Sequence, residues 1–122
     1  MADKKAVLLI EDNADARHVF ALMLDELGYS VTECDGAAEA IEKLSTGTTC
    51  DVVVTDLKMP ETSGFELRAM IRRWRPKTPV VLMTGDREAI ETALDKGFIP
   101  LLKPFSVEQL GVVLAEALRR GK

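Results

Sequence analysis

Short runs of β-branched and aliphatic residues alternate along this chain with longer stretches in which apolar residues recur at helical spacing. The short runs predict five strands, over residues 6–10, 30–34, 51–55, 79–84 and 99–102. The longer stretches predict five helices, with these apolar positions: Val19, Phe20, Met23, Leu24 and Leu27; Ala37, Ala40, Ile41 and Leu44; Phe65, Leu67, Met70, Ile71 and Trp74; Ile90, Ala93 and Leu94; Val107, Leu110, Val113, Leu114, Ala117 and Leu118. Strict alternation of strand and helix predicts an α/β fold with a parallel sheet covered on both faces.

The sequence also predicts where two of the helices start. Ser106 is followed three residues later by Gln109, which matches a capping box, and Asp12 is the predicted N-cap of the first helix. The 122 residues contain no internal repeat and no low-complexity linker. We therefore expect one domain over residues 1–122, with frayed, charged ends.

The composition is that of a globular domain, with 47% hydrophobic and 30% charged residues. A formal net charge of −4 argues against direct nucleic-acid binding, and one basic run is interpreted as a solvated helix end: Arg72, Arg73, Arg75 and Lys77. No apolar stretch approaches the roughly 18 residues that a membrane span needs. We therefore expect a cytoplasmic protein without a membrane partner.

The cysteines and the histidine do not form a metal-binding pattern. Cys34 and Cys50 have no CxxC spacing and are predicted to be small buried hydrophobic residues without a disulfide. His18 is the only histidine, which excludes a site with several histidine ligands, and a solvent-facing helical position is expected for it.

Charged and hydroxyl side chains follow the predicted strands at their carboxyl ends, where ligands bind to an open parallel sheet. Four of the five strand ends carry such groups, namely Glu11-Asp12, Thr55-Asp56, Thr84 and Lys103. Carboxylates on neighbouring strand ends, about 5 Å apart at the backbone, repel one another unless one is protonated or a cation lies between them.

An all-oxygen cluster without histidine or cysteine favours Mg²⁺. Lys103 supplies a positive charge and Thr84 a hydroxyl, the groups needed to hold the other oxygens of a phosphoryl group. Asp56 is the best nucleophile because it stands between the acidic pair and Lys103 at the mouth of the sheet. The pattern predicts phosphoryl transfer to this carboxylate.

Four segments resemble the receiver domain of two-component response regulators: VLLIEDN, DVVVTDLKMPETSGFEL, VVLMTGD and LLKPF. The resemblance runs over nearly the whole chain, and its Glu-Asp, Asp, Thr and Lys-Pro positions together are highly specific. It implies a doubly wound, flavodoxin-like (βα)5 fold whose five-stranded parallel sheet has the strand order 2-1-3-4-5.

The resemblance also implies the role of each site residue. Asp56 is the implied phosphoacceptor, which takes a phosphoryl group from a phosphohistidine on a partner. The implied Mg²⁺ ligands are Glu11, Asp12, Asp56 and the backbone carbonyl of Lys58. Thr84 and Lys103 each reach a phosphoryl oxygen, and Lys103-Pro104 is expected to be a cis peptide. Such a protein is a conformational switch, not an enzyme, and catalyses only its own phosphorylation and dephosphorylation.

The sequence departs from the family pattern at three places. Pro100 stands where the family usually has Tyr or Phe, three residues before Lys103, and puts the aromatic part of the switch in doubt. Phe98 is a candidate substitute, although simple packing is the preferred interpretation. Gly85, where Ala is common, predicts a looser loop after Thr84.

The third departure concerns two charged residues that flank the expected phosphorylation site. Lys58 and Asp86 lie two residues past Asp56 and Thr84. We expect them to form an ion pair across the mouth and to hinder the attacking water, which would lengthen the phosphoryl lifetime.

Several functions remain open at this point. The leading interpretation is a single-domain regulator or phosphorelay receiver; the alternative is a receiver excised from a hybrid histidine kinase or multidomain response regulator. An aspartyl-phosphate phosphatase usually needs a second Asp where this chain has Lys58, and Glu11-Asp12-Asn13 would repel the phosphate of a nucleotide.

The resemblance implies a histidine kinase or histidine phosphotransfer protein as donor, a downstream protein target and an optional phosphorylation-dependent homodimer. The donor is expected to contact the first helix and the rim of the site, around Asn13, Ala16, Arg17 and Pro104-Phe105. The face formed by the fourth helix, fifth strand and fifth helix is the expected output or dimer surface.

Overall fold

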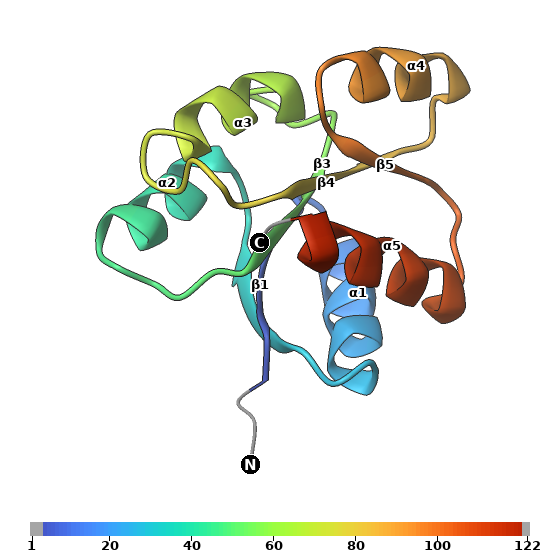
Figure 1. The fold of residues 1–122 in the computed structure, drawn as a ribbon, viewed down its shortest axis with the longest axis horizontal. Helices are drawn as coiled ribbons and strands as arrows, with labels where there is room; N and C mark the ends of the chain where they lie inside the picture. The colour runs from blue at the N-terminus through green and yellow to red at the C-terminus, as the bar shows by residue number, and fades with distance from the viewer. Residues whose placement is uncertain (1–3, 121–122) are drawn as a thin grey trace.

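Strands and helices alternate strictly in the computed structural model, which describes residues 4–120 (Figure 1). The strands are β1 (Ala6–Ile10), β2 (Ser30–Cys34), β3 (Val52–Asp56), β4 (Val80–Thr84) and β5 (Ile99–Leu102). The helices are α1 (Ala14–Glu26), α2 (Ala37–Ser45), α3 (Gly64–Ile71), α4 (Arg87–Asp95) and α5 (Val107–Arg120). All strand pairs are parallel, in the order β2-β1-β3-β4-β5, which confirms the predicted fold class and topology.

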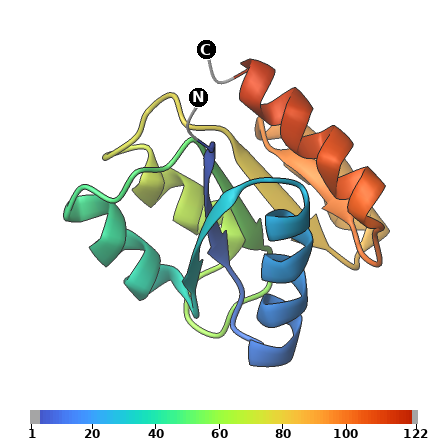
Figure 2. The same cartoon turned by 90° about the horizontal axis from the view of Figure 1, so that it is seen from below.

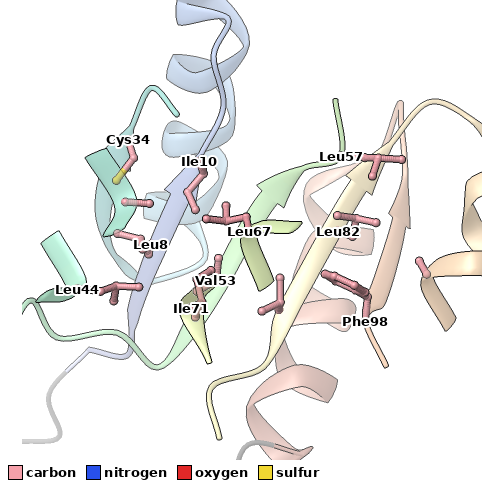
Figure 3. Close-up of a cluster of buried hydrophobic side chains, with 13 residues drawn as sticks. Leu8, Ile10, Cys34, Leu44, Val53, Leu57, Leu67, Ile71, Leu82 and Phe98 are labelled. Carbon is pink, nitrogen blue, oxygen red and sulfur yellow. The ribbon is translucent and has the colours of Figure 1, made fainter. Parts of the chain in front are cut away.

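Helices cover both faces of the sheet (Figures 1 and 2). α1 and α5 lie on one face, where Leu24 and Leu114 are fully buried. α2, α3 and α4 lie on the other face, where Leu44, Leu67 and Ala93 join a second buried cluster (Figure 3). The sheet is therefore the middle of three layers.

The central strands are apolar on both faces because helices cover both sides of them. In β1, Val7 and Leu9 pack toward α1 and α5, whereas Leu8 and Ile10 pack toward the opposite cluster. All four are at most 1% exposed. Figure 3 shows Leu8 beside the neighbouring strand residue Val53 in this second cluster. The uninterrupted apolar strands make the sheet a rigid support for the groups at its edge.

The element boundaries differ from the predictions by one residue at β3 and β4. β3 runs one residue further than predicted and ends at Asp56, while β4 begins at Val80. The capping box of Ser106 and Gln109 is confirmed by both of its hydrogen bonds, at 2.8 and 3.1 Å.

The predicted N-cap of the first helix was wrong. Asn13, not Asp12, precedes the first helical residue with an extended backbone, and its Oδ1 accepts a hydrogen bond from the Ala16 N–H at 2.9 Å. A cap side chain reaches a backbone N–H two or three residues ahead, so one residue of shift takes Asp12 out of range. Asp12 thereby stays available to the acidic cluster.

Some predicted apolar helix positions lie at the surface. Trp74 falls beyond the end of α3 and is 46% exposed, while Val19 and Leu94 are 52% and 56% exposed. Val19 and Leu94 are exposed because each helix packs only a stripe of its surface against the sheet, and these two positions lie outside that stripe.

The cysteines, the histidine and the helices can be compared with the remaining expectations. Cys34 is buried and Cys50 is half-buried, both are free thiols, and burial raises their pKa values to about 12 and about 11. His18 is exposed on α1. Within residues 4–120, no helix is both long and apolar enough to cross a bilayer.

Candidate functional site

The carboxyl ends of four neighbouring strands meet at one edge of the sheet and carry the predicted site residues. Glu11 follows β1, Asp56 ends β3, Thr84 ends β4 and Lys103 follows β5. Sheet-like hydrogen bonding continues past the strand ends, because the Lys103 N–H donates to the Thr84 carbonyl at 2.8 Å. The backbone that carries the site is therefore held by the sheet itself.

Three carboxylates converge at this edge. Glu11, Asp12 and Asp56 each offer one oxygen, and these oxygens lie within 4.8 Å of one another. Glu11 is 2% exposed, Asp56 is half-buried and Asp12 is exposed, so the cluster opens toward solvent on the Asp12 side. An all-oxygen donor set of this kind, open to water, suits Mg²⁺, which keeps several waters when it binds to carboxylates.

Lys103 bridges two of these carboxylates. Its Nζ lies 3.1 Å from Asp56 Oδ1 and 3.3 Å from Glu11 Oε1. Burial favours the neutral amine, but the hydrogen bonds and charges of Asp56 and Glu11 outweigh it and raise the pKa of Lys103. The Phe20 ring of α1 lies beside the ammonium, with its centroid 5.5 Å from Nζ. The site therefore favours the charged form of Lys103 next to Asp56.

Glu11 is the carboxylate most affected by its surroundings. Burial raises its pKa, and the charge of Asp56 acts in the same direction. The Asn13 N–H, which donates to Glu11 Oε2 at 3.1 Å, and the Lys103 ammonium only partly offset this rise. One lysine therefore does not compensate the three carboxylates, and a divalent cation among them would relieve the remaining repulsion.

A pocket of about 290 Å³ opens beside Asp56. Its lining residues are Asp56, Lys58, Thr84, Gly85, Asp86 and Lys103. Thr84 is 3% exposed, and its hydroxyl accepts a hydrogen bond from the Asp86 N–H at 3.0 Å. The structure thus brings Asp56, Thr84 and Lys103 together around one space, as their positions in the sequence predicted.

The ion pair predicted between Lys58 and Asp86 is not formed. Both residues line the pocket, but none of the ion pairs within 4.0 Å among residues 4–120 joins them. Asp86 instead caps α4, where its Oδ1 accepts a hydrogen bond from the Glu88 N–H at 2.9 Å. The prediction was wrong because the Asp86 carboxylate caps the N-terminus of α4. The structure therefore gives no support to the idea that this pair slows hydrolysis of the phosphoryl group.

Pro100 lies in β5, the outermost strand of the sheet, where a missing N–H is tolerated because no further strand of the described chain pairs with it. Phe98, just before β5, is 2% exposed and packs edge-on against Phe65 at a centroid distance of 5.4 Å. Phe98 is therefore a core residue, which agrees with the packing interpretation. The Lys103-Pro104 peptide is cis, as predicted.

Arg17 supports the acidic cluster, although the sequence indicated only that it lies on the rim. Its Nη1 donates to the Glu11 carbonyl at 2.8 Å, and its Nε lies 3.5 Å from Glu33 Oε1. The side chain thus ties the end of β1 to α1 and β2. Its spacing from Glu11 gives no signal of this contact, because the contact depends on where α1 packs.

Gly64 is a second residue that the sequence did not single out. It begins α3, and a Cβ built there would lie 2.5 Å from Leu82 Cδ1 and 2.9 Å from the Asp56 carbonyl oxygen. Its N–H donates to the Leu57 carbonyl at 2.8 Å. A glycine directly after Ser63, the N-cap, was the available signal for this close approach.

Known proteins are similar to this chain over nearly its whole length. Transcriptional regulatory protein FixJ of Bradyrhizobium diazoefficiens is 30% identical over 126 residues, which span 100% of this chain and 60% of FixJ. Sensor kinase CckA of Brucella abortus is 32% identical over 124 residues, which span 98% of this chain and 13% of CckA. The chain thus spans only part of each of these relatives.

Solved structures agree as well. The crystal structure of a response regulator receiver protein from Sinorhizobium medicae has a TM-score of 0.87 and 27% identity, with 98% of each chain covered. The response regulator receiver domain family matches residues 7–115. The family matches most of the chain, and the observed strand order is the one that the resemblance implied. The chain therefore belongs to the receiver domains of two-component response regulators.

Proposed function

We propose that Asp56 of this receiver domain accepts a phosphoryl group from a phosphohistidine on a partner protein. The observation that carries the proposal is the position of Asp56, which lies 3.1 Å from a charged lysine, beside two further carboxylates and an open pocket. A lone surface aspartate has none of these neighbours. The proposed Mg²⁺ ligands are Glu11, Asp12, Asp56 and the backbone carbonyl of Lys58.

The two oxygens of Asp56 are not equivalent. Oδ1 accepts hydrogen bonds from the Leu57 N–H and from Lys103 Nζ, both at 3.1 Å. Oδ2 lacks these donors and is the oxygen that attacks phosphorus. An O–P bond forms to the carboxylate while the P–N bond to the donor imidazole breaks, which leaves an acyl phosphate on Asp56 and a neutral histidine on the partner after protonation.

The surrounding side chains stabilise the transferred group. When bound, Mg²⁺ supplies positive charge that offsets the negative charge of the phosphoryl oxygens. Lys103 contributes a second positive charge, and the Thr84 hydroxyl lies on the pocket wall, where it can turn toward a phosphoryl oxygen. Movement of Thr84 would alter its hydrogen bond with Asp86 at the start of α4 and so pass the signal to that helix.

The partners and the location follow from this proposal. A cytoplasmic histidine kinase or histidine phosphotransfer protein would dock on α1 and the rim of the site, where Asn13 is exposed and Ala16 and Arg17 are half-buried. A downstream protein, or a second phosphorylated copy, would bind the face formed by α4, β5 and α5. The domain acts as a signalling switch that catalyses only its own phosphorylation and dephosphorylation.

The central assignment is tested by incubating the protein with Mg²⁺ and acetyl phosphate and then measuring its intact mass. We expect one phosphoryl adduct, which hydroxylamine removes because acyl phosphates react with it. Asp56→Asn should abolish the adduct. Asp35→Asn is the matched control, because Asp35 follows β2 at the same sheet edge but is not part of the acidic cluster.

The proposal fails if no adduct forms in the unmodified protein, or if the adduct persists in Asp56→Asn. Loss of the adduct in Asp35→Asn as well would show that the carboxylates at this edge act without the specificity assigned to Asp56.

A further inference from the structure

A second pocket lies at the opposite edge of the sheet from Asp56, and its volume is about 380 Å³. Val80 and Ile99, the first residues of β4 and β5, form part of its wall. Since the strands are parallel, these amino ends lie at the far side of the sheet from the phosphoacceptor. The basic pocket, as we name it, also includes the cationic residues Arg68, Arg72, Lys77 and Arg120.

The basic pocket concentrates positive charge in a protein whose net charge is −4. Its four cations are accompanied by no carboxylate among the lining residues of the described chain. Within residues 4–120, Arg72 and Lys77 take part in none of the ion pairs, and Arg120 is paired through its Nε with Glu116. Among the described residues, no carboxylate therefore balances the charge at Arg72 and Lys77.

Helix ends compensate only part of this charge. α3 and α5 both end beside the basic pocket, and the partial negative charge of a helix C-terminus attracts cations. Burial lowers the pKa of Arg68, and the nearby charge of Arg72 lowers it further, so the two guanidinium groups repel each other. An anion placed between these side chains would remove the repulsion.

Arg68 is already fixed in place. Its Nη1 donates to the Lys96 carbonyl at 2.6 Å, and its guanidinium lies over the Phe98 ring, 4.9 Å from the centroid. Gly97 has a φ of +87°, and a Cβ there would come within 2.8 Å of Arg68 Nη2. The turn thus depends on glycine for its conformation and for its approach to Arg68. Because this guanidinium is already ordered, binding a ligand costs less conformational entropy.

We propose that the basic pocket binds a compact anion with two or more adjacent phosphate groups, either free diphosphate or the diphosphate of a nucleotide. Guanidinium groups pair with phosphate oxygens through two parallel hydrogen bonds, and two linked phosphates match several cations better than one does. The volume of the pocket falls within the range of small-ligand sites, roughly 300–1,000 Å³. The basic run that the sequence suggested to be a solvated helix end thus supplies Arg72 and Lys77 to a binding site.

The proposal is tested by titrating the protein with sodium pyrophosphate, and separately with ADP, at constant ionic strength and with EDTA present. Binding is followed by the NMR shifts of the Gly97 and Thr78 amides, both of which line the basic pocket. We expect saturable binding that Arg72→Gln and Lys77→Gln each weaken about fivefold to tenfold. Tighter binding of ADP would identify a nucleotide as the source of the diphosphate, and equal binding would identify free diphosphate.

Arg73→Gln is the matched control, because Arg73 is also exposed, follows Arg72 directly and does not line the basic pocket. It should leave the affinity within about twofold. Asp56→Asn should also leave it unchanged, which separates this site from the phosphoacceptor. The proposal is overturned if no saturable binding occurs below about 10 mM, if Arg73→Gln weakens binding as much as Arg72→Gln, or if a DNA duplex binds more tightly than pyrophosphate.

Discussion

Lys103 shows how much of the site chemistry depends on one side chain. It contributes the only cation within 4.0 Å of Asp56 among residues 4–120, and it also contacts the buried Glu11. Lys58 lines the same pocket but forms none of the ion pairs with a carboxylate in the described chain. Both lysines line the same pocket and carry a positive side chain, but only Lys103 lies within 4.0 Å of the Asp56 carboxylate.

Replacing Lys103 tests the importance of that distance. We expect Lys103→Met to slow phosphorylation of Asp56 by acetyl phosphate about 100-fold, because a preorganised charge near the developing phosphoryl charge is lost. Lys58→Met, the control, should change the rate less than about threefold, since its ammonium does not contact the carboxylate. Intact-mass time courses give both rates, and circular dichroism verifies that each variant is folded. Equal slowing in the two variants would contradict the assigned role of Lys103.

At the scale of elements, the junction of β3 and α3 determines where Asp56 stands. α3 begins at Gly64, whose N–H bonds to the Leu57 carbonyl just past β3. The start of the helix is capped by Ser63 and Glu66, which bond to each other's backbone N–H groups at 3.2 and 3.3 Å. The phosphoacceptor strand and the next helix are thus joined by close backbone contacts.

A methyl group at this junction should be costly. Gly64→Ala places a Cβ 2.9 Å from the Asp56 carbonyl oxygen and 3.2 Å from Leu57 Cα, which are backbone atoms that yield little. We expect the free energy of unfolding to fall by about 1–3 kcal/mol, as measured by urea denaturation. At Gly36, where nothing lies within 4 Å of the added Cβ, alanine should stay within about 0.5 kcal/mol of the original stability. Similar values for the two variants would contradict the close packing of α3 on β3.

At the scale of the whole molecule, charge is divided between the two edges of the sheet. The carboxyl edge holds Glu11, Asp12 and Asp56, and the amino edge holds the basic pocket. The acidic edge holds three carboxylates, and Lys103 is the one cation paired with them in the described chain. Any cation that binds the folded carboxylate cluster but not the unfolded chain must stabilise the fold.

Magnesium should therefore raise the thermal unfolding midpoint in a saturable way. At one hundred times its dissociation constant, the free energy of unfolding should rise by about 2.7 kcal/mol. Asp12→Asn removes an exposed carboxylate from the cluster and should strongly weaken this effect, whereas Asp35→Asn should leave it intact. Differential scanning calorimetry with Mg²⁺ or EDTA gives the midpoints. A midpoint that does not respond to Mg²⁺, or an equal response in Asp12→Asn, would argue against the metal site.

Most of the fold was predictable because its signals are local. The bounds predicted for β1, β2 and β5 match the structure, those for β3 are displaced by one residue, and β4 starts one residue later than predicted. Boundaries are harder to predict, because the hydrogen bonds that end a strand involve its neighbours. The helix caps show the same difference. The capping box of Ser106 and Gln109 lies within four residues and was predictable. Asp12 and Asn13 are both suitable N-cap residues, and only the backbone conformation shows that Asn13 caps α1.

The site was predictable to the extent that strand ends determine it. Glu11, Asp12, Asp56, Thr84 and Lys103 follow directly from the end of a strand, so the topology of a parallel sheet brings them to one edge. The contacts of Arg17 and Gly64, and the capping role that keeps Asp86 from Lys58, depend on how helices pack and begin. No fixed spacing in the sequence encodes the contact between Arg17 and the Glu11 carbonyl.

The sequence by itself determined the alternation of strands and helices and the residues at the strand ends, because apolar periodicity and strand termination act over a few neighbouring residues. The tertiary structure alone decided which charges are balanced. It placed Lys103 between Glu11 and Asp56, and it gathered Arg68, Arg72, Lys77 and Arg120 around the basic pocket at the opposite edge. The physical reason is that Coulomb interactions depend on distances in space, and only the packed helices and sheet bring residues far apart in the chain within a few ångströms of one another.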